Sequence, residues 1–584
     1  MDLDELKETK VWELYQKHVD FMHLRGIYTD TDVNYRMYNG DQWHGAKLGN
    51  IEKIQYNFIK SIVKHKVSTI TSNLFAVNYS PENLETSEFY EMAEKACELL
   101  NKRASKVFDN DYLDRKIKKW CKQSAINDEA VCYVYYNEED DMPVNEVIAK
   151  NDIMYGNEND NEIQFQPYIL LRQRKTILEL RELARKNGVS EEEVKGIVGD
   201  NDTSTASGDS AKNELEDKTW LITKFYKEKG TVHYQQSTRY CDIAKDKDTK
   251  LSLYPIAHFN WEDQEGNARG IGEVRQLIPN QLEANKTAMR RALSVKNTAY
   301  PQKVVNVDSV VNKKDVNKIG STIEFHDMGN TKASDIFMNT IPAQMSSDSE
   351  KLQTELITYS RELNNAGDTT VGNIDPSKSS GRAILAVQQA QNQPLNDQVI
   401  ELESFIEELA RIWLEMWQKY AKKGLIIETD VMNPMTGMEE TMRVKVPSSV
   451  LKRLKASIKV DITPHSAFDK YAREMSMENL LTNGQITFEE WVNSMDNNSS
   501  YDKNKLLKII ADRKRAQQQI NDMRLQGQQM LNEAEQQQQI AGDISAISTS
   551  GYDKINEVMD NQVQQVAPSL TASQEAQSRV GSPA

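Results

Sequence analysis

Histidine and cysteine, the side chains that most often bind metals or act as nucleophiles, are present but scattered along the chain. The sequence has eight histidines and four cysteines. No histidine has a second histidine, a cysteine or a carboxylate at the spacing of a metal site, and His18 and His23 are five residues apart, the wrong spacing for one helical face. The cysteines form no C-x-x-C pair; they are Cys97, Cys121, Cys132 and Cys241. We therefore predict structural or surface histidines, thiols kept reduced in a cytoplasm, no metal and no disulfide framework.

The sequence motifs of phosphate binding and hydrolysis are missing as well. There is no G-x-x-x-x-G-K-[ST] loop, no G-x-S-x-G elbow and no H-E-x-x-H pair. Gly270 and Gly272 begin like a dinucleotide fingerprint, but Arg275 stands where the third glycine belongs, which favours a flexible lead-in to a helix. The acidic run 138–141 is typical of a solvated turn. We predict no catalytic residue, no cofactor and no enzymatic activity.

A loop of small and hydroxyl-bearing residues, Asn364 to Gly381, could contact a ligand. It holds three glycines, one proline and several hydroxyl side chains, Thr369 and Thr370 among them, and Lys378 is its only cation. A loop held between two helices is suited to touch a passing ligand. The alternative is a plain connector.

Lysines also collect in a short segment with two β-like runs, Pro301–Val307 and Thr322–Phe325. These lysines interleave with Asp308 and Asp315 and are Lys303, Lys313, Lys314 and Lys318. The insert of about 40 residues is too small for a core of its own. We therefore predict that it pairs with neighbouring subunits in a ring.

Three predicted helices position these segments: Gly272–Thr298, Pro342–Leu363, and a long helix that follows Gly381 and ends near Lys423. The first two have sparse apolar residues, which is typical of helices that bridge solvent or pack against copies of themselves. Pro394 is predicted to bend the third helix one turn in. An apolar stripe predicts that the third helix lies in the core; its residues are Val399, Leu402, Ile406, Leu409, Trp413, Met416 and Tyr420. The predicted polar face carries Glu401, Glu403, Glu407, Glu408, Arg411, Glu415 and Lys419.

The first 260 residues are predicted to form an α+β domain with several small sheets. Helices are expected in 5–40 and at Asn57–Leu74, Glu88–Phe108, Asp114–Asn127 and Ile177–Lys186. Strands are expected at Phe75–Pro81, Ala130–Tyr136, Ile163–Arg172, Leu253–Phe259 and, as a hairpin, Trp220–Tyr226 with Thr231–Gln235. After the long helix come strands Leu425–Val431, Met442–Val446 and Ser457–Ile462, then helices Ala467–Asn483, Thr487–Ser494 and Tyr501 to about Ala541. The tail from Ser545 is predicted to be disordered.

The net charge of −16 argues against tight, sequence-specific DNA binding, because affinity for the duplex comes mostly from cations that neutralise phosphates. It does not argue against a conduit through which DNA passes without sticking. No run of about 18 apolar residues is present, so we predict no membrane segment. The acidic start, Met1 to Glu5, predicts no signal peptide.

Several segments together resemble the portal, or head-to-tail connector, proteins of tailed bacteriophages. They are Tyr38-Asn39-Gly40-Asp41-Gln42-Trp43 followed by the helix 57–70, Gly270-Ile271-Gly272-Glu273 before a long helix, and Ser379-Ser380-Gly381-Arg382-Ala383-Ile384 before the kinked helix. The resemblance covers nearly the whole chain and is carried by the order of these short motifs.

The resemblance implies a predominantly helical α+β fold with named parts. They are an N-terminal wing (1–262), a first stem helix (263–300), a clip (301–341), a second stem helix (342–363), a tunnel loop (364–381), a long kinked helix with the C-terminal wing (382–465), crown helices (466–544) and the tail (545–584). Thr369, Thr370 and Lys378 would approach DNA in the tunnel loop. Lys313, Lys314 and Lys318 would help form the docking surface of the clip.

The resemblance also implies a function and a set of partners. The subunit would form a ring, typically a dodecamer, at one capsid vertex of the virion after assembly in the host cytoplasm. The ring would be the channel for double-stranded DNA during packaging and ejection, and would contact the terminase large subunit, a neck adaptor, and the major capsid and scaffold proteins, but no membrane. The alternatives are a structural adaptor or scaffold without a channel and a nucleic-acid-processing enzyme.

Overall fold

The computed structural model describes most of the chain up to residue 464 and a smaller part beyond it. The described residues are 7–47, 51–82, 87–200, 217–300, 303–326 without 306, 307, 317 and 319, 337–339, 345–366 without 365, 393–464 without 422, 423 and 433–438, and scattered positions between 477 and 528. The chain divides into two compact units, Met1–Phe468 and Asp469–Ala584.

Helices open the first unit, and polar side chains cap the starts of two of them. The side chain of Thr9 accepts a hydrogen bond from the N–H of Trp12, and that of Asn57 accepts one from Lys60. The helix predicted at Asn57–Leu74 ends earlier, at Ile70, because the chain turns into a strand at Asn73. These helices are α1 (Lys10–Leu24), α2 (Ile27–Asn39), α3 (Phe58–Ile70), α4 (Ser87–Asn110) and α5 (Leu113–Asn127).

Antiparallel sheets follow, one in the order β3-β2-β9 and a larger one in the order β4-β5-β6-β7-β8. Apolar residues of both share one cluster, for example Val131 and Ile256 with Ile169 and Phe225. The smaller sheet comprises β2 (Glu129–Asn137), β3 (Met142–Ile148) and β9 (Ile256–Asn260). The larger comprises β4 (Ile153–Tyr155), β5 (Tyr168–Thr176), β6 (Lys218–Glu228), β7 (Thr231–Ser237) and β8 (Asp242–Asp248), with α6 (Ile177–Lys186) and α7 (Glu191–Val194) beside it.

The predicted hairpin is confirmed as β6–β7, with Gly230 at φ +86° in its turn. The predicted strand Ile163–Arg172 is wrong in its first part. Ile163–Phe165 forms a 3₁₀ turn, and β5 begins only at Tyr168. Pro167 has no N–H for a ladder, and the side-chain amide of Gln166 donates to the carbonyls of Asn157 and Asp160 at 2.9 and 2.7 Å, which holds the chain in a loop there.

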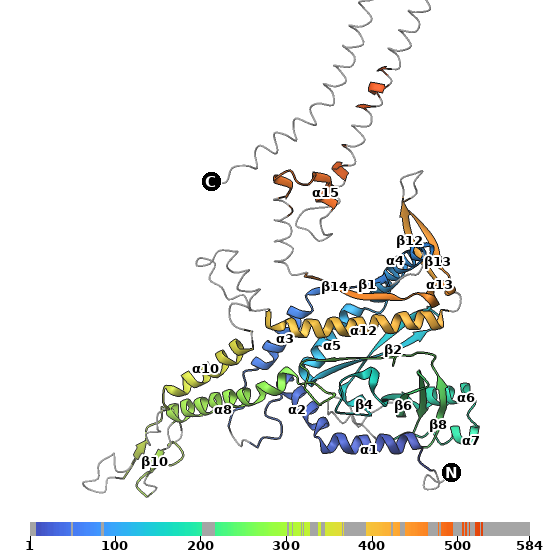
Figure 1. Cartoon of the computed structure of the whole chain (residues 1–584). Coiled ribbons are helices and arrows are strands. Elements are labelled where there is room, and N and C mark those ends of the chain that lie inside the picture. The colour runs from blue at the N-terminus through green and yellow to red at the C-terminus, as the bar shows by residue number, and fades with distance from the viewer. Residues whose placement is uncertain are drawn as a thin grey trace, which may run out of the picture. The chain divides into compact units, whose positions relative to one another are not determined.

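The helix α12 (Asn396–Tyr420) is the centre of the main core (Figure 1). Its predicted apolar stripe is confirmed: Leu402, Ile406, Leu409, Trp413 and Met416 are buried, and Val399 and Tyr420 are partly buried against them. The helix ends at Tyr420 rather than near Lys423. Pro394 lies in the 3₁₀ turn η4 (Gln393–Leu395) before α12, and the predicted helical residues 382–392 lie outside the described part of the chain.

The predicted polar face of α12 is wrong at Glu408 and Glu415. The carboxylate of Glu415 is buried and accepts the backbone N–H groups of Ser252 and Leu253 at 2.5 and 3.0 Å. Glu408 is half-buried and accepts from the amide of Gln164 at 3.0 Å. Glu415 thus binds the connection into β9, and Glu408 also accepts from the N–H of His258 in β9 at 3.4 Å, so both carboxylates fasten the core helix to the sheet.

The strands predicted after α12 are confirmed as β12 (Leu425–Met432), β13 (Glu439–Val446) and β14 (Ala456–Pro464), with the short helix α13 (Ser448–Arg453) between the last two. β14 pairs with β1 (Asn73–Pro81), so that Val77 lies opposite Val460. This pairing joins the beginning of the unit to its end.

The short insert is partly as predicted. β10 (Lys303–Val305) pairs with β11 (Phe337–Asn339), and the predicted run Thr322–Phe325 is not a strand. Only Phe325 forms an isolated bridge, with Val310. The side chain of Asn312 takes the place of a strand partner, because it donates to the carbonyl of Thr322 at 2.7 Å and accepts from the N–H of Glu324 at 2.8 Å.

In the second unit the structure describes α15 (Phe488–Asn493), which lies within the predicted helix Thr487–Ser494. Thr487 and Glu490 exchange side-chain and backbone hydrogen bonds at its start, a capping box. Trp491 and Val492 are buried in a small cluster. The predicted helices Ala467–Asn483 and Tyr501–Ala541 lie largely, and the tail after 545 wholly, outside the described residues.

Helices and sheets are both well represented, as the predicted α+β class requires. Within the described part of the chain, no helix is both long and apolar enough to cross a membrane.

Candidate functional site: a helix pair on a buried ionic base

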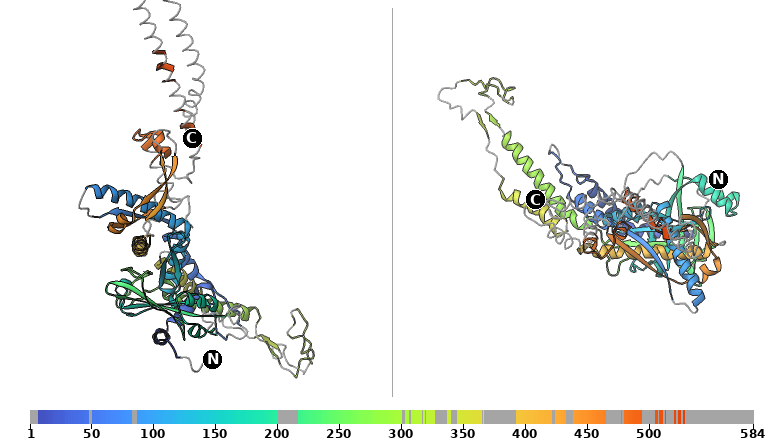
Figure 2. Two further views of the ribbon diagram at one scale, coloured as in Figure 1. Left: turned by 90° about the vertical axis from the view of Figure 1, so that its right-hand side faces the viewer. Right: turned by 90° about the horizontal axis from the view of Figure 1, so that it is seen from above.

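The long helix α8 (Glu273–Ala299) and the helix α10 (Asp348–Leu363) lie side by side (Figures 1 and 2). α8 matches its predicted span within a residue. α10 begins later than predicted, at Asp348, whose N–H is bound by the hydroxyl of Ser346 at 3.2 Å. Polar contacts tie the pair along its length: Asn280 donates to Ser360 at 3.1 Å, and Arg291 donates to Gln353 at 2.8 Å and lies 3.6 Å from Glu350.

The two halves of α8 lie in different environments. Its buried residues all fall between Glu273 and Ala288. Beyond that point the helix is largely exposed, apolar side chains included: 37% of Leu293 and 69% of Val295 are exposed. α8 therefore begins inside the body of the first unit and leaves it towards β10 (Figure 1).

The start of α8 is held by buried charges. The carboxylate of Glu273 lies 2.8 Å from the ammonium of Lys66 on α3 and accepts from the indole N–H of Trp261 at 3.3 Å. The N–H of Gly272 donates to Asp128 at 2.7 Å, and a Cβ on Gly272 would meet the Asp128 backbone nitrogen at 2.9 Å. The glycine is therefore needed for close approach, and Glu273 places a negative charge at the positive end of the helix dipole.

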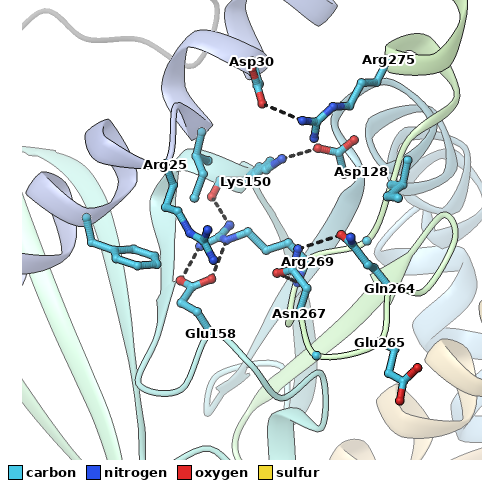
Figure 3. Close-up of a pocket in the computed structure, with 15 residues that line it drawn as sticks. Arg25, Asp30, Asp128, Lys150, Glu158, Gln264, Glu265, Asn267, Arg269 and Arg275 are labelled. Atoms are coloured by element: carbon cyan, nitrogen blue, oxygen red, sulfur yellow. Dashed lines mark hydrogen bonds and ion pairs between the residues drawn. The ribbon is translucent and has the colours of Figure 1, made fainter.

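A cluster of buried ion pairs around Arg269, Glu129, Glu158 and Lys66 with Glu273 holds the start of α8, and we call it the ionic base. Arg269, just before α8, lies at its centre (Figure 3). Its guanidinium is bidentate to Glu158, at 3.0 and 3.1 Å, and also pairs with Glu129. Glu129 in turn accepts from the hydroxyl of Tyr155 at 3.0 Å and lies 3.0 Å from the ring nitrogen of His258. Burial by itself would raise the pKa of Glu129, but Arg269 and His258 outweigh burial and lower that pKa to about 2.

A cavity of about 480 Å³ lies over this base, and opposite charges balance in its wall (Figure 3). Arg269 faces Glu158, Lys150 pairs with Asp128, and Arg275 lies 3.6 Å from Asp30. Because these cations already have carboxylate partners, the cavity wall is an ionic scaffold for the start of α8 and does not favour an added anion.

A second clamp joins α8 to α3 through neutral side chains. The side-chain oxygen of Gln281 accepts from the N–H groups of Phe58 and Ile59 at 3.1 and 3.3 Å, and that of Asn285 accepts from the N–H of Tyr56 at 3.0 Å. The first N–H groups of a helix have no partner within it, so α8 supplies what the start of α3 lacks. Gln281 and Asn285 are fully buried.

Sequence reasoning missed these anchors. The only local signals are that Gln281 and Asn285 are four residues apart on one helical face and that Gly272 precedes Glu273. Arg269, Glu129 and Lys66 carry no pattern that sets them apart from surface charges.

The residues predicted to contact DNA, Thr369, Thr370 and Lys378, lie outside the described residues. The predicted docking lysines Lys313, Lys314 and Lys318 are exposed in the turns after Val310, and Lys318 lies 2.7 Å from Asp315. They belong to the insert at the far end of α8, away from the ionic base. Among the described residues, no group of three or more His, Cys, Asp or Glu side chains could hold a metal ion.

A family model described as phage P22-like portal protein matches residues 189–572, well over half of the chain. The match includes α8, the insert, α10 and α12. No curated protein matches the sequence.

Proposed function

The chain belongs to the phage P22-like portal protein family, and from this premise we propose that it assembles into a ring around a channel through which double-stranded DNA is packaged and ejected. In this proposal the ring lies at one capsid vertex of the virion. α8 and α10 of each subunit form the wall of the channel.

The observation that carries the proposal is the contrast along α8. Buried ion pairs anchor its first half, whereas its second half leaves the body with exposed apolar residues. Exposed apolar side chains of this kind are removed from water when a second copy of the chain packs against them.

Charge complementarity supports contact between α8 of one subunit and α10 of the next. The exposed face of α8 carries Lys286 and Arg290, which also lie 3.8 and 2.9 Å from Glu283 of the same helix, and the exposed face of α10 carries Glu355 and Glu362. In a ring, one face of each subunit meets a different face of its neighbour, so opposite charges on the two helices favour closure.

The remaining parts are proposed with the bounds predicted above. The wing comprises 1–262 and 382–465, the clip 301–341, the tunnel loop 364–381, and the crown 466–544, followed by the tail 545–584. The clip, with Lys313, Lys314 and Lys318, would dock the terminase large subunit and later the neck adaptor. The major capsid and scaffold proteins would contact the outside of the ring, which we propose to be a dodecamer.

Negative-stain microscopy of the purified full-length chain, with its mass measured in solution, tests the ring. We expect rings with a central hole. The double variant Lys286→Glu/Arg290→Glu is expected to abolish rings, and the compensating pair Glu355→Lys/Glu362→Lys is expected to restore them.

Charge reversal at Lys95, which is exposed on α4, is the matched control and should leave the rings intact. A stable monomer or dimer that forms no ring even when concentrated would favour a scaffold or adaptor without a channel. Metal-dependent turnover of DNA or nucleotide would instead favour an enzyme.

The proposed DNA contact is tested separately in the assembled particle. Lys378→Glu is expected to reduce packaged DNA or its retention while rings still form, because a carboxylate repels the phosphate backbone. Thr369→Ala/Thr370→Ala should have a smaller effect. Normal packaging by Lys378→Glu would contradict the contact.

A further inference from the structure

A groove rich in tyrosine lies where the sheets β3-β2-β9 and β4-β5-β6-β7-β8 meet the C-terminal end of α12. Its volume is about 450 Å³. We call it the tyrosine groove; the residues that define it are Tyr133, Tyr135, Phe225, Tyr234, Lys250 and Lys419. β2, β6, β7 and the C-terminal end of α12 contribute to its walls, and Figure 1 shows these elements close together.

Aromatic rings follow one another across the groove from one sheet to the other. The ring centroids of Tyr135 and Tyr133 are 5.9 Å apart, those of Tyr133 and Phe225 5.7 Å, and those of Phe225 and Tyr234 6.4 Å. Phe225 is buried beneath the others, and Tyr135 is 42% exposed. The groove therefore has an apolar floor and an accessible aromatic end.

Three tyrosine hydroxyls of the groove have no hydrogen-bond acceptor in the described part of the chain. Among the described residues, nothing accepts a hydrogen bond from the hydroxyls of Tyr133, Tyr135 and Tyr234, whereas the nearby hydroxyl of Tyr420 is used by the carbonyl of Thr249 at 2.7 Å. These free hydroxyls lie beside apolar ring surface. A hydrogen bond from them to a ligand is therefore partly shielded from water, which strengthens it.

Lysines add positive charge to the rim. Lys250 and Lys419 are exposed and form no ion pair with any described residue. An ammonium group only donates hydrogen bonds. Two carboxylates, Glu138 and Asp248, also line the groove, and Lys247 is a third lysine there, so three lysines stand against two carboxylates. Asp248 already accepts the backbone N–H of Lys250 at 2.7 Å. In a chain of net charge −16, this rim favours a ligand that brings carboxylates.

A proline-containing peptide is the ligand whose chemistry fits these groups. In the polyproline II conformation the backbone carbonyls are free to accept hydrogen bonds, and proline has no N–H that would need an acceptor. Its rings pack on aromatic side chains, and little conformational entropy is lost on binding.

We propose that the tyrosine groove binds an extended, acidic, proline-containing segment of a partner protein. This inference does not depend on the channel, and it gives the outer body of the subunit a recognition site of its own.

The test is fluorescence anisotropy with the full-length protein in the assembly state in which it purifies. The probe is a fluorescein-labelled peptide of Glu-Pro-Pro repeats. We expect saturable binding that weakens as salt is raised. Tyr135→Ala and Lys419→Glu should each weaken binding by about tenfold or more, since each removes a direct contact.

Matched controls separate the groove from the general surface. Tyr90→Ala removes a tyrosine of similar exposure (46%) on α4, and Lys95→Glu reverses an exposed lysine on the same helix; both should bind like the unchanged protein. Peptides of Lys-Pro-Pro or Glu-Ala-Ala repeats should bind weakly.

Four results would overturn the proposal. One is no binding of the Glu-Pro-Pro peptide at about 1 mM. Another is binding that Tyr135→Ala and Lys419→Glu leave unchanged. The third is tight binding of a labelled oligothymidine that these two variants abolish, which would make the groove a nucleic-acid site. If the two variants changed the number of subunits, the groove would be a contact between copies of this chain, which also contradicts the proposal.

Discussion

The two halves of α8 show how one helix can serve two purposes. In the half near Glu273, charged groups are buried and each principal cation has a carboxylate partner. In the half near Val295, apolar groups are exposed and the polar contacts are few. Removing a partner is costly where charges are desolvated and cheap where water can replace it. The first half is therefore held by contacts within this chain, and in the proposed ring a neighbouring subunit covers the second half.

The largest effect is expected at the centre of the ionic base. Arg269→Met leaves Glu129 buried and without its main counter-charge, so the free energy of unfolding should fall by about 3–5 kcal/mol. Thermal unfolding followed by circular dichroism measures the change. Lys296→Met, an exposed lysine in the second half of the same helix, is the control and should change stability by less than about 0.5 kcal/mol. Equal losses of stability in the two variants would contradict the claim that buried ion pairs stabilise only the first half of α8.

The same base predicts an acid dependence of stability. The pKa of Glu129 is about 2 in the folded protein, below its ordinary value of 4.5. Its ion pairs therefore contribute fully above about pH 4.5, and their contribution is lost as the pH falls from there towards 2. Unfolding measured across this range should show a fall in stability that is shallower in Glu129→Gln. An unchanged slope in that variant would mean that other carboxylates cause the acid sensitivity.

A smaller effect is expected at the clamp on α3. Gln281→Ala leaves the buried N–H groups of Phe58 and Ile59 without an acceptor, which costs about 1–3 kcal/mol. Hydrogen exchange of these two amides should accelerate with it. Gln276→Ala, exposed one turn earlier, is the matched control. Unaltered exchange in Gln281→Ala would show that water replaces the amide.

The smallest effect within one subunit is expected at the projecting half. Val295→Ser should change the stability of the isolated chain by no more than about 0.5 kcal/mol, because the side chain is 69% exposed. The concentration needed for ring formation should nevertheless rise. A loss of stability without any effect on assembly would reverse the roles assigned to the two halves.

Local patterns predicted much of the fold. The stripe of α12 from Leu402 to Met416, the hairpin β6–β7 and the span of α8 all follow from side-chain periodicity and turn residues, which act between neighbours in sequence. The order of short motifs also indicated the portal family, to which the chain belongs. The predicted strand Thr322–Phe325 failed because the side chain of Asn312 competes with strand pairing, which a count of β-formers does not register.

Only the tertiary structure decided which polar residues hold the helix pair. Glu415 has the same place in the helical pattern as solvated glutamates, yet it is buried because the chain before β9 brings two N–H groups to it. Arg269 and Glu129 are 140 residues apart and meet only because β2, β9 and the start of α8 converge. The sequence by itself determined the span of α8 and which face of α12 enters the core, since periodicity is local. The tertiary structure alone decided which charges pair in the ionic base, because burial of a charge depends on contacts between segments that are distant in the sequence.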